Sequence, residues 1–294
     1  MRPSWPAPEG PALPARAEMT EAQSPSTVTN ARMSQPRVSA ATAIAPSVAR
    51  GLSMTAEGLY KRFGTVQALT GLSLEARAGE ALGLLGPNGA GKTTFMHMMA
   101  GVTRPDAGHI QVGQMGPPTR RRVRRLLGIA PQAVALYPRL TAAENLRFFG
   151  QLYGVPRAEL KDRVEQGLAL AHLQSRRDHR AGTFSGGMQR RLNLACAVIH
   201  QPQVLLLDEP TAGVDPQSRT HIFESIANLR NQGLTIICST HLLEEAQRLC
   251  DRVAIVDGGR VQALDSTTAL IERYGAADLE EVFLELTGKE LRDQ

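Results

Sequence analysis

Aromatic residues are scarce in this chain of 294 residues, at 4%, and its formal net charge is only +5. The shortage of aromatic residues weakens the case for a protein that holds single-stranded nucleic acid by base stacking. The charge is too small by itself to indicate a nucleic-acid partner. Long apolar runs are missing as well, because no stretch approaches the roughly 18 apolar residues of a membrane-spanning helix. We therefore expect no nucleic-acid partner and no segment that spans the bilayer.

Cysteine is also rare. The three cysteines, Cys196, Cys238 and Cys250, share no spacing typical of a metal site or a disulfide framework. Each lies in apolar surroundings, which predicts reduced core residues in a cytosolic protein. Hydrophobic residues make up 42% of the chain, enough for one large domain with additional segments.

The first part of the chain has a different composition from the rest. Residues 1–53 contain eight of the 18 prolines and the only tryptophan, Trp5, and they are rich in Ala, Ser and Thr without sustained periodicity. Such a segment buries too little to offset its ordering entropy, so we expect a disordered extension. It lacks an apolar signal core, and its three glutamates argue against an organellar transit peptide. Translation starting at Met33 or Met54 is the other interpretation.

A glycine-rich loop lies between a predicted strand at residues 81–85 and a predicted helix at residues 92–100. Its pattern is G-x-x-x-x-G-K-[ST], in which glycines let backbone N–H groups surround a β-phosphate and the helix N-terminus adds its dipole. Lys92 then reaches the β- and γ-phosphates of ATP, and the Thr93 hydroxyl is a ligand for Mg²⁺. The ATP-binding residues predicted here are Gly86, Pro87, Asn88, Gly89, Ala90, Gly91, Lys92, Thr93 and Thr94.

Two adjacent carboxylates follow a second apolar run. Residues 204–207 predict a buried strand, and Asp208 and Glu209 come directly after it. Asp208 is suited to hold Mg²⁺ through water, and Glu209 to accept a proton from the attacking water. Each pattern also has an interpretation without function. The glycine loop could be an accidental strand–turn–helix, and the carboxylates could mark a turn where a strand reaches solvent. Their occurrence together favours a nucleotide-hydrolysis site.

A second anion-binding helix start occurs upstream of these carboxylates. Ser185 suits an N-cap, and Gly186 and Gly187 leave the first N–H groups of the helix accessible. One nucleotide does not need two such sites in one subunit, so we expect Ser185 and Gly187 to clamp the γ-phosphate of ATP bound to another copy, in a head-to-tail dimer. The helix itself presents one apolar face, formed by Leu192, Ala195, Cys196 and Ile199.

Four segments in order and spacing resemble the ATP-binding subunits of ABC transporters: Gly86–Thr93, Ser185–Gln189, Val204–Glu209 and the later His241. The resemblance covers roughly Met54 to the C-terminus. It implies an α/β fold with a P-loop NTPase core, a parallel-rich sheet, an antiparallel β subdomain and an α-helical subdomain. We place the ATP-binding domain at 54–278, its helical subdomain at about 140–190, and a C-terminal tail at 279–294.

The same resemblance assigns further residues. Phe63 matches the aromatic residue that stacks on adenine, although a core phenylalanine is the alternative and Tyr60 is a rival. Gln132 matches the glutamine that touches Mg²⁺ and water and senses the membrane partner. Asp215 matches the loop that crosses the dimer interface, and His241 matches the histidine that contacts the γ-phosphate. With Glu209, the expected catalytic residues are thus Gln132 and His241, and the expected metal ligands are Thr93, Gln132 and Asp208.

The signature segment departs from the usual Leu-Ser-Gly-Gly-Gln of the family, because Met188 follows the two glycines. A methionine there is similar to the variant in daunorubicin-resistance and nodulation exporters, and we interpret it as a neutral substitution; packing beneath the helix is the alternative. The tail also resembles that subgroup. Asp278 and Glu281 form a capping-box pattern before an amphipathic helix, with Gly288 as its stop, and we expect this helix to pack on the domain.

The function implied is that of an ATP-binding and ATP-hydrolysing subunit at the cytoplasmic face of the cell membrane. Its partners would be a second copy or a homologous subunit and a separate integral membrane permease, exporting a drug, antibiotic, lipid or polysaccharide. The alternatives are soluble ABC-type ATPases of translation or DNA maintenance. An ATPase of translation would need a second phosphate loop, which the sequence lacks. An ATPase of DNA maintenance would need a long coiled coil or a zinc insertion, and the sequence shows no heptads and no zinc ligands for either. The arginine run 120–125 predicts a solvated helix face, with anionic lipid contact as the alternative.

Overall fold

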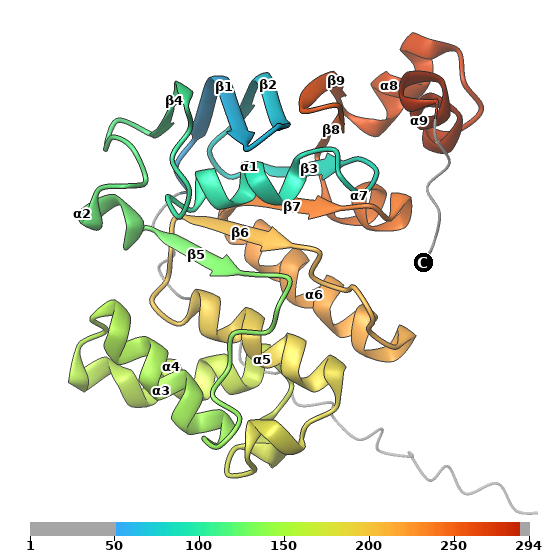
Figure 1. The fold of residues 1–294 in the computed structure, drawn as a ribbon. Coiled ribbons are helices and arrows are strands. Elements are labelled where there is room, and N and C mark those ends of the chain that lie inside the picture. Colours follow the sequence, from blue (N-terminus) through green and yellow to red (C-terminus); the bar gives the residue numbers. More distant parts are fainter. Residues whose placement is uncertain (1–50, 289–294) are drawn as a thin grey trace, which may run out of the picture. The chain divides into compact units, whose positions relative to one another are not determined.

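The computed structural model describes residues 51–288, whose fold is drawn in Figure 1. Residues 1–50 of the predicted extension and residues 289–294 of the predicted tail lie outside the described part of the chain. Gly51, by contrast, is buried, and its N–H donates to the Gly233 carbonyl at 3.0 Å. The folded domain thus already includes residues just before Met54.

A six-stranded sheet forms the centre of the described domain. In spatial order its strands are β5 (Leu127–Ala130), β6 (Val204–Asp208), β7 (Thr235–Thr240), β3 (Ala81–Leu85), β8 (Arg252–Asp257) and β9 (Arg260–Asp265). All neighbouring pairs are parallel except β8 and β9. Strands β3, β6 and β7 are buried at every residue, as expected of parallel strands covered on both faces. The carboxyl ends of β5, β6, β7 and β3 therefore meet at one edge.

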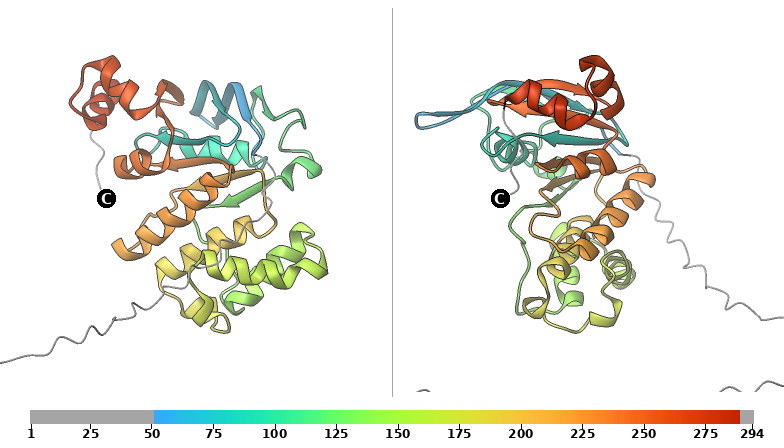
Figure 2. Two further views of the ribbon diagram at one scale, coloured as in Figure 1. Left: turned by 180° about the vertical axis from the view of Figure 1, so that it is seen from behind. Right: turned by 90° about the vertical axis from the view of Figure 1, so that its right-hand side faces the viewer.

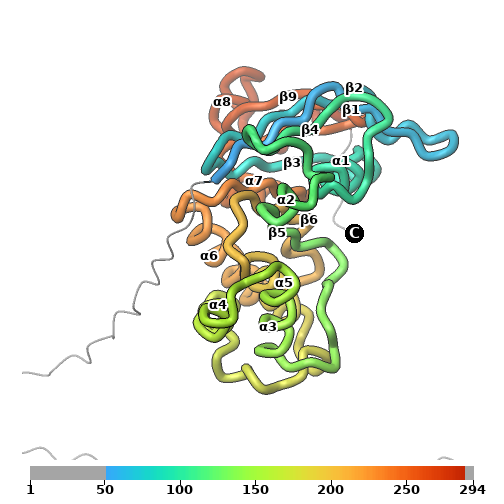
Figure 3. The backbone as a smooth tube through the Cα atoms, turned by 90° about the vertical axis from the view of Figure 1, so that its left-hand side faces the viewer, coloured from blue at the N-terminus to red at the C-terminus, as the bar shows by residue number. Residues whose placement is uncertain are grey.

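A second, antiparallel sheet is the antiparallel β subdomain that the resemblance implied. Its spatial order is β2 (Val66–Ala76), β1 (Met54–Phe63) and β4 (Ala107–Val112). Phe63 pairs with Val66 across a two-residue turn, and Gly64 in that turn has φ 57°, which glycine adopts without Cβ strain. The end of this hairpin, in blue, projects from the sheet in Figures 2 and 3.

Helix α1 (Lys92–Met99) packs between the two sheets. Phe95 and Met98 are completely buried in a cluster that joins residues of β3 and β6 to residues of β1 and β2. On the other face of the large sheet, α6 (Pro216–Asn231) and α7 (Leu243–Leu249) contribute Ile226 and Leu249 to a second cluster. The helix that follows the phosphate loop is thus packed against hydrophobic residues of both sheets.

An α-helical subdomain follows β5 and lies below the sheet in Figures 1 and 3. Its helices are α3 (Ala142–Tyr153), α4 (Arg157–Leu170) and α5 (Gly186–Val198), with 3-10 turns η1 (Gln174–Arg176) and η2 (Ala181–Thr183). Thr141 and Glu144 form a reciprocal capping box at the start of α3. The apolar face predicted for α5 is buried in the cluster at the centre of this subdomain.

The predicted C-terminal helix exists and packs on the domain. Helices α8 (Thr267–Tyr274) and α9 (Leu279–Thr287) join a cluster with β8, in which Val282 and Phe283 are fully buried. Asp278 accepts the Glu281 N–H at 3.0 Å, as predicted, but the Glu281 carboxylate accepts from the Ala277 N–H at 2.7 Å and not from the N-cap residue itself. Gly288 ends the helix in a left-handed conformation.

Two expectations from the composition and one from the arginine run can be compared with the described residues. Within 51–288, no helix combines the length and the apolar character needed to cross a membrane. All three cysteines are free, and burial raises the pKa of the Cys250 thiol to about 12. The arginine run forms helix α2 (Arg121–Arg124) and the residues beside it; its arginines are exposed while Val123 is buried.

Candidate nucleotide-hydrolysis site

The phosphate loop connects β3 to α1 and depends on its glycines. A Cβ at Gly86 would overlap the Val256 carbonyl, and one at Gly91 would lie 2.6 Å from the Ala68 carbonyl. Gly91 is also the N-cap of α1 and has φ 100°, a left-handed conformation that residues with a Cβ rarely adopt. The two glycines therefore let the loop pack closely against neighbouring backbone, and this packing fixes the shape of the loop.

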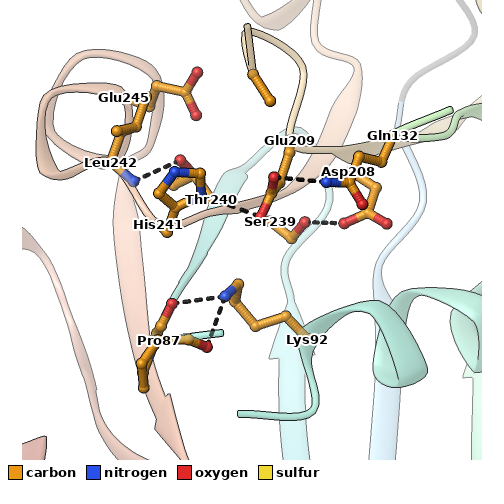
Figure 4. A network of polar contacts seen from close by, with 12 residues as sticks. Pro87, Lys92, Gln132, Asp208, Glu209, Ser239, Thr240, His241, Leu242 and Glu245 are labelled. Carbon is orange, nitrogen blue, oxygen red and sulfur yellow. Dashed lines mark hydrogen bonds and ion pairs between the residues drawn. The ribbon is translucent and has the colours of Figure 1, made fainter. Parts of the chain in front are cut away.

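Lys92 begins α1, and its side chain is folded back over the loop. Its Nζ donates to the carbonyls of Gly86 (2.6 Å) and Pro87 (3.1 Å), as Figure 4 shows. Burial lowers the pKa of Lys92, while the nearby carboxylates of Glu209 and Asp208 act in the opposite direction. The predicted lysine and the two predicted carboxylates thus share one electrostatic environment.

The two carboxylates are set by the end of β6. Asp208 is buried and accepts a hydrogen bond from the Ser239 hydroxyl, its direct neighbour across the β6–β7 pairing. Glu209 follows with φ 47°, a left-handed backbone that is unusual for a residue with a side chain, and its N–H donates to the Ser239 carbonyl at 3.0 Å. Ser239 therefore binds both acidic residues.

Three predicted catalytic side chains converge. Gln132 Nε2 donates to Glu209 Oε2 at 2.9 Å, and His241 Nδ1 lies 3.1 Å from Glu209 Oε1 (Figure 4). Gln132 follows β5, Glu209 follows β6 and His241 follows β7, so the parallel order of these strands brings the three together. Such convergence at the carboxyl ends of parallel strands is where α/β proteins bind their ligands.

The residues present fit ATP with Mg²⁺. The loop offers backbone N–H groups at a helix N-terminus and a buried ammonium, both suited to phosphates. The Thr93 hydroxyl, the Asp208 carboxylate and the Gln132 amide oxygen are hard oxygen ligands of the kind Mg²⁺ prefers. The phosphate loop and the polar side chains beside it are together those of a nucleotide-hydrolysing P-loop protein.

Two further polar residues support this site and were not predicted. Arg190 in α5 donates through Nη1 to the Gln132 carbonyl and through Nη2 to the Ala212 carbonyl at 3.4 Å. Glu245 in α7 is buried, accepts a hydrogen bond from the Thr211 hydroxyl, and has its pKa raised by burial. Neither lies in a recognised motif, although Arg190 comes soon after the signature glycines, and that position was the only signal available.

The signature glycines begin α5, and Ser185 is its N-cap. The Ser185 hydroxyl accepts from the Met188 N–H at 3.3 Å, as predicted for a cap. A Cβ at Gly186 would meet nothing within 4 Å, while one at Gly187 would overlap the Ser218 side chain and lie 3.0 Å from Asp215 Oδ1. Gly187 therefore permits α5 to pack against the start of α6, and Gly186 leaves an open, exposed helix start.

Some of the predicted site residues lie apart from Lys92 in the same chain, among them those at the start of α5 and Asp215. The strands β5 and β6 lie between α5 and α1 in Figures 1 and 3. Asp215 caps α6, where its carboxylate accepts the Ser218 N–H at 2.9 Å, and this bond lowers its pKa. Phe63 near the hairpin turn is 51% exposed, so the core-phenylalanine alternative is wrong; Tyr60, 45% exposed, remains a rival for the same role.

Met188 packs against the hydrophobic cluster of the helical subdomain. This contact supports the packing interpretation of the methionine. The next residue, Gln189, uses its amide within the same subdomain, since Nε2 donates to the carbonyls of Ala181 and Phe184, each at 3.3 Å. Gln189 is thus not a substitute for the glutamine that the family signature has at the position of Met188.

Comparison with known proteins gives the family of this chain. Residues 69–212 match the family model described as ABC transporter. The chain is 43% identical over 224 residues to the linearmycin resistance ATP-binding protein LnrL of Bacillus subtilis (strain 168), covering 76% of this chain and 72% of that protein. It is 42% identical over 239 residues to the Nod factor export ATP-binding protein I of Ralstonia nicotianae (strain ATCC BAA-1114 / GMI1000), covering 81% and 74%.

Solved structures show the same fold. The structure described as the ATP binding subunit of an ABC transporter aligns with a TM-score of 0.72 and 29% identity, covering 79% of this chain and 98% of that one. A dimeric post-hydrolysis state of the ATP-binding cassette MJ0796, bound to ADP and Pi, aligns with a TM-score of 0.66 at 24% identity, covering 72% and 98%. The chain belongs to the ABC transporter family, as one of its ATP-binding and ATP-hydrolysing subunits.

Proposed function

We propose that this chain hydrolyses Mg-ATP at the site around Lys92 and Glu209, as one half of a head-to-tail dimer that drives a separate membrane permease in export. The observation that carries the proposal is the convergence of Gln132 and His241 on the Glu209 carboxylate, close to the buried Lys92. A strand exit without catalytic function would need no such arrangement of three polar side chains on one carboxylate.

ATP would be held by the loop N–H groups and Lys92, with the adenine against the exposed Phe63. Thr93, Asp208 and Gln132 would hold Mg²⁺, which supplies charge neutralisation at the phosphate oxygens when bound. The bond from Ser239 fixes the orientation of the Asp208 carboxylate. This is the support that oriented metal ligands generally need.

We expect Ser239→Ala to raise the Mg²⁺ concentration needed for half-maximal hydrolysis by about 10- to 100-fold. The change removes a hydrogen bond from the buried Asp208 carboxylate, which then rotates more freely. The measurement is ATPase activity over a Mg²⁺ titration, beside the melting temperature. Ser225→Ala is the matched control, because the Ser225 hydroxyl is also buried but donates to the Leu170 carbonyl, away from this site. An unchanged Mg²⁺ requirement in a folded Ser239 variant would contradict the assignment of Asp208.

Glu209 would accept the proton of the attacking water. Its left-handed backbone and its two side-chain partners hold the carboxylate in one orientation. Gln132 is suited to orient the water, and His241 to contact the γ-phosphate. Arg190 positions the Gln132 backbone by donating to its carbonyl.

The dimer follows from the open helix start at Ser185–Gly187. An exposed N-terminus of α5 is an anion site with no ligand in its own subunit, because the phosphate loop lies beyond β5 and β6. A head-to-tail arrangement supplies it with the γ-phosphate of the opposite copy. The structurally similar MJ0796 cassette is dimeric in its solved structures, which supports the dimer in this proposal.

Export is inferred from the relatives. Their names specify linearmycin resistance and Nod factor export, and identity to them is 42–44%. The chain would act at the cytoplasmic face of the membrane, with the helical subdomain contacting an integral membrane permease. The transported compound would be of drug, antibiotic, lipid or polysaccharide type.

The test begins with the reading frames beside this chain: if one encodes an integral membrane protein, the two are co-expressed, purified in detergent and reconstituted in vesicles. We expect a stable complex whose ATPase activity exceeds that of the isolated chain. Lys92→Ala should assemble equally well and hydrolyse nothing. Failure to form a membrane complex, with full ATPase activity in the isolated chain, would contradict the permease and leave the ATPase assignment intact.

A further inference from the structure

Two histidines and a glutamate meet where the helical subdomain packs on α6. Within the part of the chain that the structure describes, His172, His221 and Glu224 form a group whose potential metal-ligating atoms all lie within 4.8 Å of one another. The two imidazole rings are 4.7 Å apart between centroids, with their planes inclined by 35°. His221 Nδ1 lies 3.4 Å from Glu224 Oε2. None of the three belongs to the nucleotide site.

The backbone holds His172 in an unusual position. It is the first residue past the cap of α4 and has φ 53°, the left-handed conformation that usually calls for glycine. Its N–H donates to the Ala169 carbonyl and the next N–H, of Leu173, to the Leu168 carbonyl, which is the Schellman pattern of a helix end. A histidine in a glycine position directs its side chain from the end of α4 toward α6.

Side-chain bonds join the two elements that carry the ligands. Ser225 Oγ in α6 lies 2.9 Å from the Leu170 carbonyl oxygen and 2.8 Å from the His221 carbonyl oxygen, and its one proton is shared between these two acceptors. Arg191 in α5 donates to the Ala171 carbonyl at 2.6 Å and to the His172 carbonyl at 3.3 Å. The Ser225 contact joins the end of α4 to α6, and the Arg191 bonds hold the His172 backbone against α5.

One ligand atom in the group lacks a hydrogen-bond partner. His221 Nδ1 is buried and makes no hydrogen bond of acceptable geometry, although the Glu224 carboxylate is within ion-pair distance. Buried polar nitrogen atoms normally have such a partner, so this nitrogen is available to bind a ligand. The nearby guanidinium of Arg191 opposes a bound cation, and the Glu224 carboxylate supplies the compensating negative charge.

We propose that His172, His221 and Glu224 bind a divalent transition-metal ion, with Zn²⁺ as the best fit. Imidazole nitrogen and carboxylate oxygen at bond lengths of about 2.0–2.1 Å place neighbouring tetrahedral ligands about 3.3 Å apart. The His221–Glu224 separation of 3.4 Å matches that spacing. Two nitrogen ligands disfavour Mg²⁺ and Ca²⁺, which take oxygen ligands. The fourth position is left to water.

Bound metal would cross-link two parts of the fold. His172 belongs to the helical subdomain, whereas His221 and Glu224 lie on α6, the helix that begins after Asp215. The ion would restrain movement of the helical subdomain relative to α6. This inference does not depend on the proposed export function.

The test uses the full chain without a histidine tag, stripped of metal and kept nucleotide-free. Titration with ZnCl₂ by calorimetry should show one zinc site in the unmodified chain. The zinc affinity should fall at least about tenfold in each of three variants: His172→Gly, His221→Ala and Glu224→Gln. Loss of a direct ligand should lower the affinity at least as much as disturbance of a residue that only supports a ligand. His172→Gly suits the left-handed backbone, so it removes the ligand without adding strain. Zinc at 100 times its dissociation constant should raise the melting temperature of the unmodified chain by on the order of 5 °C.

The matched control is His109→Ala. His109 lies 3.2 Å from Glu57 on the surface, so it is a comparable histidine–glutamate pair without a second histidine. This variant should bind zinc like the unmodified chain. Zinc binding that survives in His172→Gly but disappears in His241→Ala would belong to the nucleotide site and would overturn the proposal. The proposal would also be overturned if the unmodified chain bound no zinc, or if His221→Ala and Glu224→Gln bound zinc as tightly as the unmodified chain and His109→Ala do.

Discussion

Replacing Glu209 by glutamine is expected to lower the rate of ATP hydrolysis by roughly 10²–10⁴-fold and to leave nucleotide binding intact. The change removes the proton acceptor while it keeps the side-chain shape. Gln132 Nε2 can still donate to the remaining carbonyl oxygen. Lys92, Thr93 and Asp208 are unchanged, so the residues proposed to hold Mg-ATP remain. The measurement is single-turnover hydrolysis beside equilibrium binding of ATP.

The same variant should trap the proposed dimer. Each nucleotide would also be held by Ser185 and Gly187 of the opposite copy, and product release would no longer separate the two copies. Light scattering or size-exclusion chromatography with Mg-ATP should therefore show a stable dimer for Glu209→Gln. Lys92→Ala is the control and should stay monomeric, because it cannot hold the triphosphate.

Hydrolysis at nearly the unmodified rate would contradict the assignment of Glu209 as the base. This result should be sought in the complex with the proposed permease as well as in the isolated chain, because that permease would bring the two copies together. In that case Gln132 and His241, which both contact Glu209, would have to orient the water without it.

Ser185→Arg should abolish turnover, whereas Met188→Gln should retain it. The first change removes the hydroxyl that caps α5, at a cost of about 1 kcal/mol in stability, and fills the open helix start with a long side chain. The phosphate clamp proposed for the opposite copy is then blocked. Ser185→Thr keeps a capping hydroxyl and is the matched control, expected to remain active. The measurements are steady-state ATPase activity and melting temperature.

Met188→Gln tests the departure from the family signature. Met188 is partly buried against the helical-subdomain cluster, so a polar replacement should cost on the order of 1 kcal/mol in stability. Activity should survive because Ser185, Gly186 and Gly187 are unchanged. A folded Met188→Gln chain without ATPase activity would show that the methionine is not a neutral substitution.

The parts of the site that are contiguous in the chain could be predicted from the sequence. The strand, glycine loop and helix from Ala81 to Met99 depend on local backbone preferences, because glycine alone tolerates the conformation of Gly91 and the helix start directly follows it. The cap at Ser185 and the C-terminal helix stop at Gly288 are local for the same reason. Apolar periodicity likewise predicted the buried face of α5.

The tertiary structure decided which distant side chains meet. Gln132, Glu209 and His241 converge because β5, β6 and β7 are parallel neighbours, and strand order is not encoded in any one segment. The same pairing places Ser239 beside Asp208, a contact that no motif indicated. Met188 was ambiguous in the sequence, and its packing is decided by helices that lie far from it along the chain.

The histidine group shows the same division. His172 and His221 are far apart in the sequence and share no metal-binding spacing, so nothing in the sequence indicated that they share a site. They meet only because the end of α4 packs against α6. Local preferences determined the loops, caps and helices of this protein. The pairing of strands and the packing of helices, which depend on burying apolar surface from distant segments together, determined which of its polar residues share a site.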